Sequence, residues 1–237
     1  MKIRTIAQIL KYGCFRLLGK VPNHSIDLKI NKTRHGSDYG GWVVAHESIK
    51  KDSVVYSFGI GTDISFDLAM IAQYGTKVYG FDPTPGSQVY VEKTKTSTNF
   101  VFYPYGIASD DKQEKFYVPA NPDFISHSKT PSAPESPFIL VEMKKLSTIM
   151  KELNHSQVDI LKMDIEGFEY EVIKNILQEN LNVKQILVEF HHDMYTNITK
   201  ADTNEIVALL RKAGYKIFHI SNSVREYSFI KDEATDD

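Results

Sequence analysis

The sequence predicts an α/β fold with a mainly parallel β-sheet and an antiparallel pair of strands at its end. Two observations support this class. Short apolar, β-branched segments alternate with amphipathic helical segments, and the last two strand segments are separated only by a turn. At 237 residues with 42% hydrophobic residues, the chain is long enough to bury one large core.

The first half of the chain contains three predicted strands and one predicted helix. Residues 54–58 read Val-Val-Tyr-Ser-Phe, an apolar run that ends at a glycine and indicates a buried strand. The apolar residues over 66–72 indicate a helix that closes near Gly75. Two further strands are predicted over 77–81 and 99–103, and the first of them ends at an Asp-Pro pair.

A proline-rich stretch then interrupts the alternation. Residues 119–137 hold five prolines, which exclude a helix or a central strand and predict an excursion on the surface. Alternation resumes with a strand over 158–163, a helix over 169–177 and a strand over 185–190.

A helix and two strands close the pattern. Asp202, with Glu205 three residues later, has the form of a capping box and predicts the start of the helix. Gly214 predicts its end, because glycine readily takes the left-handed conformation that follows a helix. Strands over 215–220 and 226–230 are the predicted antiparallel pair.

Composition excludes several classes of protein. The chain has 28 Lys and Arg against 30 Asp and Glu, so 28 − 30 gives a formal net charge of −2, which argues against nucleic acid as a partner. A single cysteine excludes an internal disulfide and every multi-cysteine metal site. No run of 18 apolar residues is present, so no membrane span is predicted. These features predict a reducing compartment, and we expect the cytoplasm.

We separate an N-terminal segment, residues 1–33, from a domain over 34–237. Residues 1–20 hold five basic groups and no acid, with apolar residues at roughly helical spacing, and they lack the apolar stretch of a secretory signal. Two interpretations stay open. The helix contacts an anionic membrane face or a protein partner, which would place the protein at the inner face of a membrane, or its apolar side packs on the domain.

A Gly-x-Gly turn lies directly between the first predicted strand and the first helix. Gly59 and Gly61 permit a sharp bend and the close approach of the backbone to a bound nucleoside. Asp82 follows 21 residues after Gly61, at the end of the next strand, where an acid can accept hydrogen bonds from ribose hydroxyls. Together these features predict a cofactor that contains a nucleoside.

Two neighbouring residues decide which cofactor is predicted. A dinucleotide fingerprint would place a third glycine at position 64, where this chain has Ile64. Asp63 would repel a phosphate and would suit a cationic ligand. S-adenosylmethionine (SAM) has no phosphate and carries a sulfonium and an amino group, so SAM is the predicted cofactor.

Acidic and imidazole side chains follow two later strands. Asp164 and Glu166 follow the first, and Glu189, His191 and His192 close the second. These groups can supply a general base, or oxygen and nitrogen ligands for Mg²⁺ or another divalent metal. The predicted metal ligands are Asp164, Glu189 and His191.

These motifs resemble the FkbM-type family of class I SAM-dependent methyltransferases. The resemblance rests on the Gly-x-Gly turn, on Phe81-Asp82-Pro83 and, most specifically, on the Asp-Ile-Glu-Gly-Phe-Glu run over 164–169. Segments over 55–61 and 188–192 look closer still to the methyltransferase-like subgroup. The likeness covers residues 34–230 and implies a Rossmann-like sheet of seven strands whose last strand is antiparallel.

The resemblance also implies roles for individual residues. The glycine turn would contact the methionine part of SAM, Asp82 the ribose and residues 106–108 the adenine. Asp164 would lie at the substrate end of the site. Ser57 stands where the family commonly has an acid, so Asp63 is implied to contact the amino group of SAM. The residues implied to bind SAM are Phe58, Gly59, Gly61, Asp63, Asp82, Pro83, Ile107, Ala108 and Asp164.

These features predict methyl transfer from SAM to a hydroxyl of a sugar, a glycan or a small natural product. An oxygen acceptor must lose its proton, and His191 is the preferred base because it follows a strand end at once. The other candidates for catalysis are Asp164, Glu189 and His192. Residues 119–137 and 36–42, the latter with Trp42, are the expected walls of the acceptor pocket.

Two other functions stay open. A nicotinamide-dependent oxidoreductase would use the same glycine turn and Asp82, and Ile64 counts against it. A SAM-fold binding or scaffold protein without turnover would be favoured if Asp164, Glu166 and Glu189 proved dispersed rather than convergent.

Overall fold

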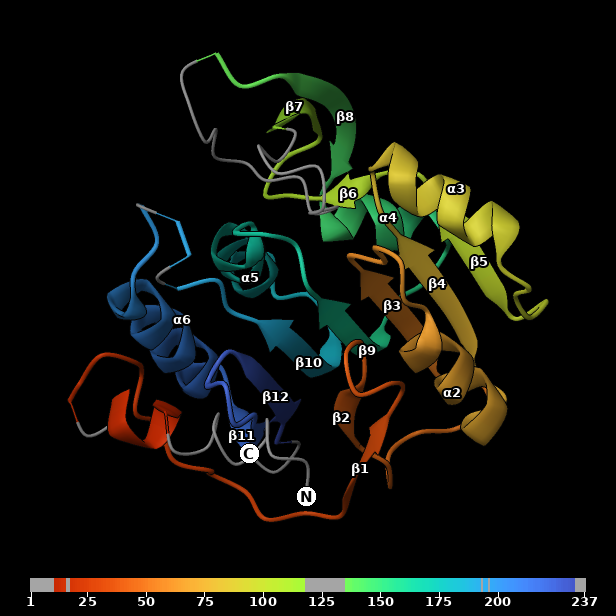
Figure 1. The fold of residues 1–237 in the computed structure, drawn as a ribbon. Coiled ribbons are helices and arrows are strands. Elements are labelled where there is room, and N and C mark those ends of the chain that lie inside the picture. Colours follow the sequence, from red (N-terminus) through yellow and green to blue (C-terminus); the bar gives the residue numbers. More distant parts are fainter. Residues whose placement is uncertain (1–10, 16–17, 118–134, 193, 196, 233–237) are drawn as a thin grey trace.

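A seven-stranded sheet forms the centre of the fold (Figure 1). The structure is a computed structural model that describes residues 11–15, 18–117, 135–192, 194–195 and 197–232. The strand order is β11-β12-β10-β9-β3-β4-β5. These strands are β3 Val54–Phe58, β4 Lys77–Phe81, β5 Phe100–Tyr103, β9 Val158–Met163, β10 Val183–Glu189, β11 Tyr215–Ile220 and β12 Glu226–Lys231.

Only one strand runs against the others. β12 pairs antiparallel with both β10 and β11, whereas the pairs from β10 through β9, β3 and β4 to β5 are parallel. The predicted Rossmann-like sheet of seven strands with an antiparallel last strand is therefore confirmed.

The order of the strands changes direction between β3 and β9. From β3 the chain runs outward through β4 and β5, and it later returns to place β9 on the other side of β3. In open α/β sheets, ligands bind beyond the carboxyl ends of the strands at such a switch point. The Gly-x-Gly turn follows β3 and Asp164 follows β9, so both motifs lie at this point.

Helices cover both faces of the sheet (Figure 1). A larger apolar cluster joins α4, α5 and α6 to one face through Leu161 and Met163, and a second cluster joins α2 and the strand before β3 to the other face through Val55 and Ile160. Because neighbouring strand residues point to opposite faces, this double burial explains the continuous apolar runs. The helices are α2 Ser65–Tyr74, α3 Pro85–Lys93, α4 Leu146–Glu152, α5 Glu169–Gln178 and α6 Lys200–Lys212.

Two smaller sheets were not predicted. One pairs β1 Lys32–His35 antiparallel with β2 Trp42–Ala45. The other has the order β6-β8-β7, with bounds β6 Gly106–Ile107, β7 Lys112–Tyr117 and β8 Phe138–Lys144. β7 and β8 flank the proline-rich stretch, of which residues 118–134 lie outside the described residues.

The start of α6 differs from the prediction. Its N-cap is Thr199, whose side chain accepts the N–H of Ala201 at 3.2 Å. Asp202 accepts the N–H of Thr199 at 2.8 Å and is the acidic partner of this capping box, not the cap. The prediction was shifted by three residues, because a second acid three positions after Asp202 imitates the same spacing. Gly214, with a φ of +89°, follows the end of the helix as predicted.

The N-terminal segment contacts the domain where it is described. Residues 11–15 are helical, and Tyr12 and Phe15 pack against the larger apolar cluster. Residues 18–19 form a turn, so the predicted helix does not extend to residue 20, and residues 1–10 and 16–17 lie outside the described residues. Contact with a membrane face or a partner stays a prediction, as does the boundary between segment and domain. Among the described residues, no helix combines the length and apolar character needed to cross a membrane.

Candidate functional site

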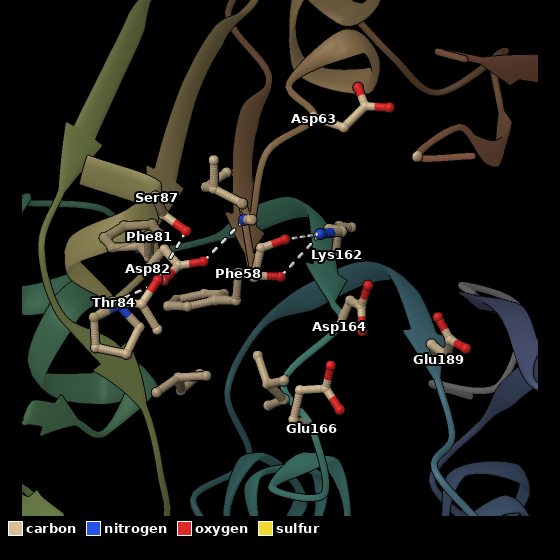
Figure 2. A pocket seen from close by; sticks show the side chains of 18 of the residues that line it. Phe58, Asp63, Phe81, Asp82, Thr84, Ser87, Lys162, Asp164, Glu166 and Glu189 are labelled. Carbon is tan, nitrogen blue, oxygen red and sulfur yellow. Dashed lines mark hydrogen bonds between the residues drawn. The ribbon is translucent and has the colours of Figure 1, made fainter. Parts of the chain in front are cut away.

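A cavity of about 440 Å³ lies at the switch point, at the carboxyl ends of β3, β4, β9 and β10 (Figure 2). Asp82 and Thr84 lie on one side of it, and Asp164, Glu166 and Glu189 lie on the other, as Figure 2 shows. The residues predicted from the sequence that line the cavity are Phe58, Gly59, Gly61, Asp63, Asp82, Pro83, Ile107, Asp164, Glu189 and His191.

The Gly-x-Gly turn adopts a conformation that requires glycine at its first position. Gly59 has a φ of +79°, and a Cβ there would lie 1.7 Å from the carbonyl oxygen of Asp164. Gly61 has a φ of +53° with open space around it. Its N–H donates to Oδ2 of Asp82 at 2.9 Å. The turn and the acid of the next strand are thus held together.

Asp82 is fixed by three hydrogen bonds. Besides the N–H of Gly61, it accepts the N–H of Thr84 at 2.9 Å and the hydroxyl of Thr84 at 2.6 Å, both at Oδ1. A carboxylate has about four acceptor positions, so one position remains for a hydroxyl of a ligand. The geometry therefore fits the ribose role that the resemblance implies.

Lys162 is a buried cation beside the glycine turn that was not predicted. Its Nζ donates to the carbonyl oxygens of Phe58 at 3.0 Å and Gly59 at 2.5 Å. Asp67 of α2 lies buried on the same face, and burial raises its pKa to about 6 although Lys162 opposes that rise. The sequence did carry a sign of this contact, because Lys162 stands among apolar residues in a predicted strand. A lysine buried in this way must find polar partners.

An apolar slot lies next to Asp82. It is formed by Pro83, Ile107 and Met143, which all line the cavity. Gly106 permits this closeness, because a Cβ there would lie 2.6 Å from the sulfur of Met143. Ile107 and Met143 come from β6 and β8, so strands that were not predicted supply two of its three side chains. Its place and character fit an adenine ring.

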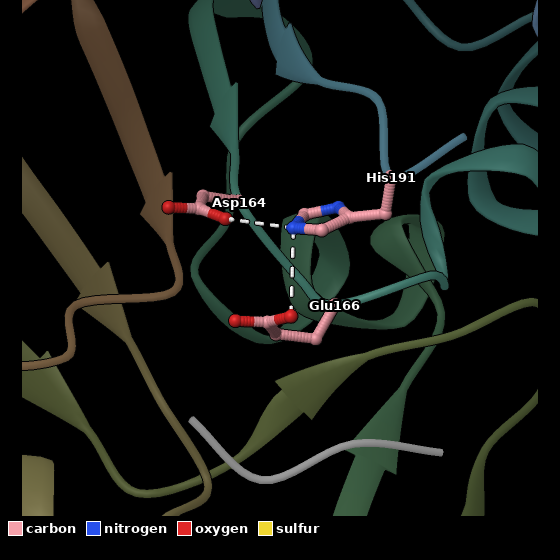
Figure 3. Close-up of side chains that lie close together, drawn as sticks. All are labelled: Asp164, Glu166 and His191. Carbon is pink, nitrogen blue, oxygen red and sulfur yellow. Dashed lines mark ion pairs between the residues drawn. The ribbon is translucent and has the colours of Figure 1, made fainter. Parts of the chain in front are cut away.

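On the opposite side, Asp164, Glu166 and His191 form a carboxylate–histidine cluster (Figure 3). Nε2 of His191 lies 3.6 Å from Oδ1 of Asp164 and 3.5 Å from Oε2 of Glu166. Nδ1 of His191 lies 2.8 Å from Oε1 of Glu169, a fully buried carboxylate at the start of α5. Tyr195 donates its hydroxyl to Glu166 at 2.6 Å. Each member of the cluster comes from a strand end or the turn that follows it.

Electrostatics in this cluster favour a positive charge. Burial would lower the pKa of His191, but Glu169, Glu166 and Asp164 together raise that pKa to about 10. Burial also raises the pKa of Asp164, while Lys162 and His191 oppose the rise. The surrounding carboxylates therefore favour the protonated form of the His191 ring, and in that form the ring cannot accept a proton. The prediction that His191 acts as the general base did not take this protonation into account.

Comparison with known families gives the relationship. The methyltransferase FkbM domain matches residues 43–217, which is well over half of the chain. The chain belongs to the FkbM methyltransferase family. The resemblance read from the glycine turn, Asp82 and the run over 164–169 is confirmed.

Individual relatives extend this comparison. The chain is 26% identical over 191 residues to probable methyltransferase-like protein 24 of Homo sapiens, covering 78% of this chain and 46% of that protein. The counterpart in Rattus norvegicus is 22% identical, with 78% and 47% covered. The chain thus spans about half the length of these curated relatives. Among solved structures it is similar to M. jannaschii TYW2 in complex with AdoMet, at 11% identity and a TM-score of 0.35, covering 88% of this chain and 90% of that one.

Three predicted residues occupy places that their implied roles did not anticipate. His192 does not line the cavity; it is buried with its Nδ1 at 3.2 Å from Oγ1 of Thr203. Ala108 is also buried outside the lining, and its N–H donates to the carbonyl of Lys144 at 3.0 Å. Asp63 lines the cavity of the FkbM domain, but its two oxygens accept hydrogen bonds from the Ser37 hydroxyl and the Ser65 N–H.

The expected pocket wall over 36–42 does reach the cavity. Trp42 is buried and lines it, with Nζ of Lys162 lying 5.6 Å from the centre of its ring, so it is both a core residue and a wall residue. Tyr39 lines the mouth of the FkbM domain cavity and is 87% exposed. Met194 lies at the same mouth and is 48% exposed. The mouth therefore offers apolar and aromatic surface to a ligand.

Glu189 lies in the cavity but outside the carboxylate–histidine cluster. It stands directly opposite Glu226 in the antiparallel pair of β10 and β12, and both glutamates line the cavity. Burial and the nearby Asp164 raise the pKa of Glu189 to about 7. Like charges placed opposite one another on neighbouring strands destabilise a sheet. The FkbM domain therefore holds this carboxyl group at the expense of stability.

Removing that charge is expected to stabilise the protein. The pKa of Glu189 in the folded state lies above its ordinary value of 4.5, so its destabilising effect grows as the pH rises from about 4.5 to 7 and is complete above 7. Glu189→Gln should raise the free energy of unfolding by up to about 3 kcal/mol at pH 8, and by little near pH 4.5. Urea denaturation of both proteins at the two pH values measures this.

The matched control is Glu205→Gln, which removes an exposed glutamate paired with Lys174 at 2.8 Å. It should change the free energy of unfolding by less than about 1 kcal/mol at either pH. A Glu189→Gln protein that is no more stable than the parent at pH 8 would contradict the expectation.

Proposed function

We propose that this chain is a SAM-dependent O-methyltransferase that acts on a hydroxyl of a sugar, a glycan or a small natural product. The observation that carries the proposal is the convergence of the Gly-x-Gly turn, Asp82 and Asp164 on one cavity at the switch point. Membership of the FkbM family supports the reaction type.

The cavity has a suitable place for each part of SAM. The apolar slot beside Pro83 suits the adenine, the open acceptor position of Asp82 suits a ribose hydroxyl, and the glycine turn lets the backbone approach the methionine part. When bound, SAM supplies an activated methyl group on a sulfonium sulfur. The chain's own contribution is to align an acceptor oxygen with that methyl group, and such alignment accounts for several kcal/mol of rate enhancement.

The charges of the cavity support an uncharged acceptor. Of the basic groups that line it, Lys162 directs its Nζ to two backbone carbonyls, and His191 is enclosed by carboxylates. Without a bound metal ion, an anionic acceptor would meet an excess of acidic groups, whereas hydroxyl groups can donate hydrogen bonds to their oxygens. The exposed ring of Tyr39 at the mouth supports stacking on a sugar ring. The acidic residues that line the cavity are Asp63, Asp82, Asp164, Glu166, Glu189 and Glu226.

The two other functions are less well supported. A scaffold protein without turnover was expected to show dispersed carboxylates, but Asp164, Glu166 and Glu189 all line one cavity. Some nicotinamide-dependent enzymes use a Tyr-x-x-x-Lys pair. That spacing occurs here at 170–174 and 227–231, and none of those tyrosines or lysines lines the cavity.

Ligand-dependent thermal unfolding tests the proposal. SAM or its demethylated product, at about a hundred times its dissociation constant, should stabilise the fold by about 2.7 kcal/mol, and NAD and NADP should not. Transfer of a labelled methyl group to a panel of neutral sugars and glycosides, with sugar phosphates and uronic acids as the anionic comparison, then identifies the acceptor. Stabilisation by NAD or NADP alone, or by none of the four ligands, would contradict the proposal.

A further inference from the structure

The spacing of the carboxylate–histidine cluster fits the ligands of a single metal ion. The distances of 3.5 and 3.6 Å from Nε2 of His191 to the two carboxylates exceed the range of about 2.7–3.2 Å for N–H···O hydrogen bonds. Two ligands that each lie about 2.1 Å from one cation are about 3.0 Å apart in octahedral geometry and about 3.4 Å apart in tetrahedral geometry. The three ligand atoms all lie within 4.8 Å of one another.

The orientation of His191 is a second, independent observation. The side chain is only 3% exposed, and the two oxygens of Glu169 accept the N–H groups of Ile165 and Gly167, so both act as acceptors. Nδ1 of His191 must therefore donate to Glu169, and this leaves Nε2 directed at the cavity between Asp164 and Glu166 (Figure 3). Metal-binding histidines are commonly held in this way, by a carboxylate on the nitrogen that does not bind the metal.

Glu166 is supported in a similar manner. Its Oε2 accepts the hydroxyl of Tyr195 at 2.6 Å, and Tyr195 also lies beside the ring of His191. Hydrogen bonds to a ligating carboxylate fix its direction before the metal binds. Three protein ligands, two of them held by a hydrogen-bonding neighbour, are typical of a catalytic metal site that keeps further coordination positions open.

We propose that Asp164, Glu166 and His191 bind a divalent first-row transition metal ion, with Mn²⁺ as the probe. One imidazole nitrogen with two carboxylate oxygens favours such an ion over Mg²⁺, which prefers oxygen ligands alone. Glu166 replaces the predicted ligand Glu189, which lies outside the cluster. The open positions face the cavity, so the ion would hold an oxygen of the acceptor; this last step rests on the proposed methyltransferase function.

Titration of Mn²⁺ into the full chain, treated with EDTA and free of SAM, tests the metal site by the loss of the free-ion electron paramagnetic resonance signal. The parent protein should bind one ion, at least tenfold more tightly than Mg²⁺ in competition. Glu166→Gln and His191→Ala should each weaken binding of Mn²⁺ by tenfold or more. Glu189→Gln, which removes a neighbouring carboxylate of the same cavity, should retain an affinity within about threefold of the parent.

Two results would overturn the metal site: no binding of Mn²⁺ to the parent, or equal loss of affinity in Glu189→Gln and Glu166→Gln. If His191→Ala does not fold, Glu166→Gln still decides, because its side chain is partly exposed and the change preserves its shape. Stabilisation by SAM in EDTA is measured in parallel. Stabilisation by SAM without binding of Mn²⁺ rejects the metal and retains the methyltransferase, and binding of Mn²⁺ without any effect of SAM does the reverse.

Discussion

Gly59→Ala should be among the most damaging single substitutions in this protein. A methyl group at this position would overlap the carbonyl oxygen of Asp164, at 1.7 Å, and the residue would keep a φ of +79° that disfavours any side chain. Neither β3 nor β9 can move away, because the two strands pair directly in the centre of the sheet. We expect the free energy of unfolding to fall by more than about 3 kcal/mol and stabilisation by SAM to disappear.

Gly61→Ala is the matched control for this expectation. It lies two residues away in the same turn, also with a positive φ, but nothing lies within 4 Å of the added methyl group. Its destabilisation should be limited to the conformational cost of about 1–2 kcal/mol. Urea denaturation of both variants measures the difference. Equal losses in the two variants would mean that backbone conformation, and not the contact with Asp164, makes glycine necessary at position 59.

The central sheet could be predicted because its strands are buried on both faces. Such strands are apolar at most positions, and runs such as 54–58 and 158–163 carry this signal without any knowledge of their neighbours. The strands of the smaller sheets carry no comparable signal. β7 reads Lys-Gln-Glu-Lys-Phe-Tyr, and only Phe116 among these residues is buried. Its pairing with β8 joins segments on either side of the proline-rich stretch, which no local pattern reveals.

The candidate site was predictable in its ligand-binding half and less so in its acidic half. The glycine turn and Asp82 belong to one βαβ unit, so their spacing in the sequence fixes their spacing in the fold. The members of the carboxylate–histidine cluster depend on details of the chain path. Glu166 joins the cluster with a φ of +54°, a left-handed conformation that is uncommon outside glycine, whereas Glu189 faces Glu226. From the sequence, Glu189 was predicted as a metal ligand and Glu166 was not.

The two adjacent histidines also could not be distinguished from the sequence. In the sequence, His191 and His192 differ only by one position beyond the end of β10. In the fold, His191 faces the cavity because the buried carboxylate of Glu169, 22 residues earlier, lies next to its ring, while His192 lies beside Thr203 of α6. The partner that distinguishes them is distant in the chain. Because only one of the two histidines lines the cavity, substituting each in turn tests which one turnover requires.

His191→Ala should reduce turnover by about 10²-fold or more while binding of SAM survives. Nε2 of His191 is the nitrogen that faces Asp164 and Glu166, so its loss leaves two carboxylates of the cavity without the group between them. Turnover is expected to fall in either of two cases. In the first, the deprotonated ring of His191 accepts the proton of the acceptor hydroxyl; in the second, Nε2 of His191 binds a metal ion. The proposed binding surface for SAM, around Asp82, lies on the other side of the cavity and should be unaffected.

His192→Ala is the matched control, because it removes the same side chain one residue further on. It should lower stability, since His192 is buried and bonded to Thr203, but its rate at saturating acceptor should stay within a few-fold of the parent. The measurements are the rate of formation of demethylated SAM with the acceptor that the panel identifies, and the dissociation constant of SAM for each variant. Equal turnover in His191→Ala and the parent would remove His191 from catalysis. Equal losses in both variants would show that general disruption of this segment, and not the chemistry of one imidazole, had been measured.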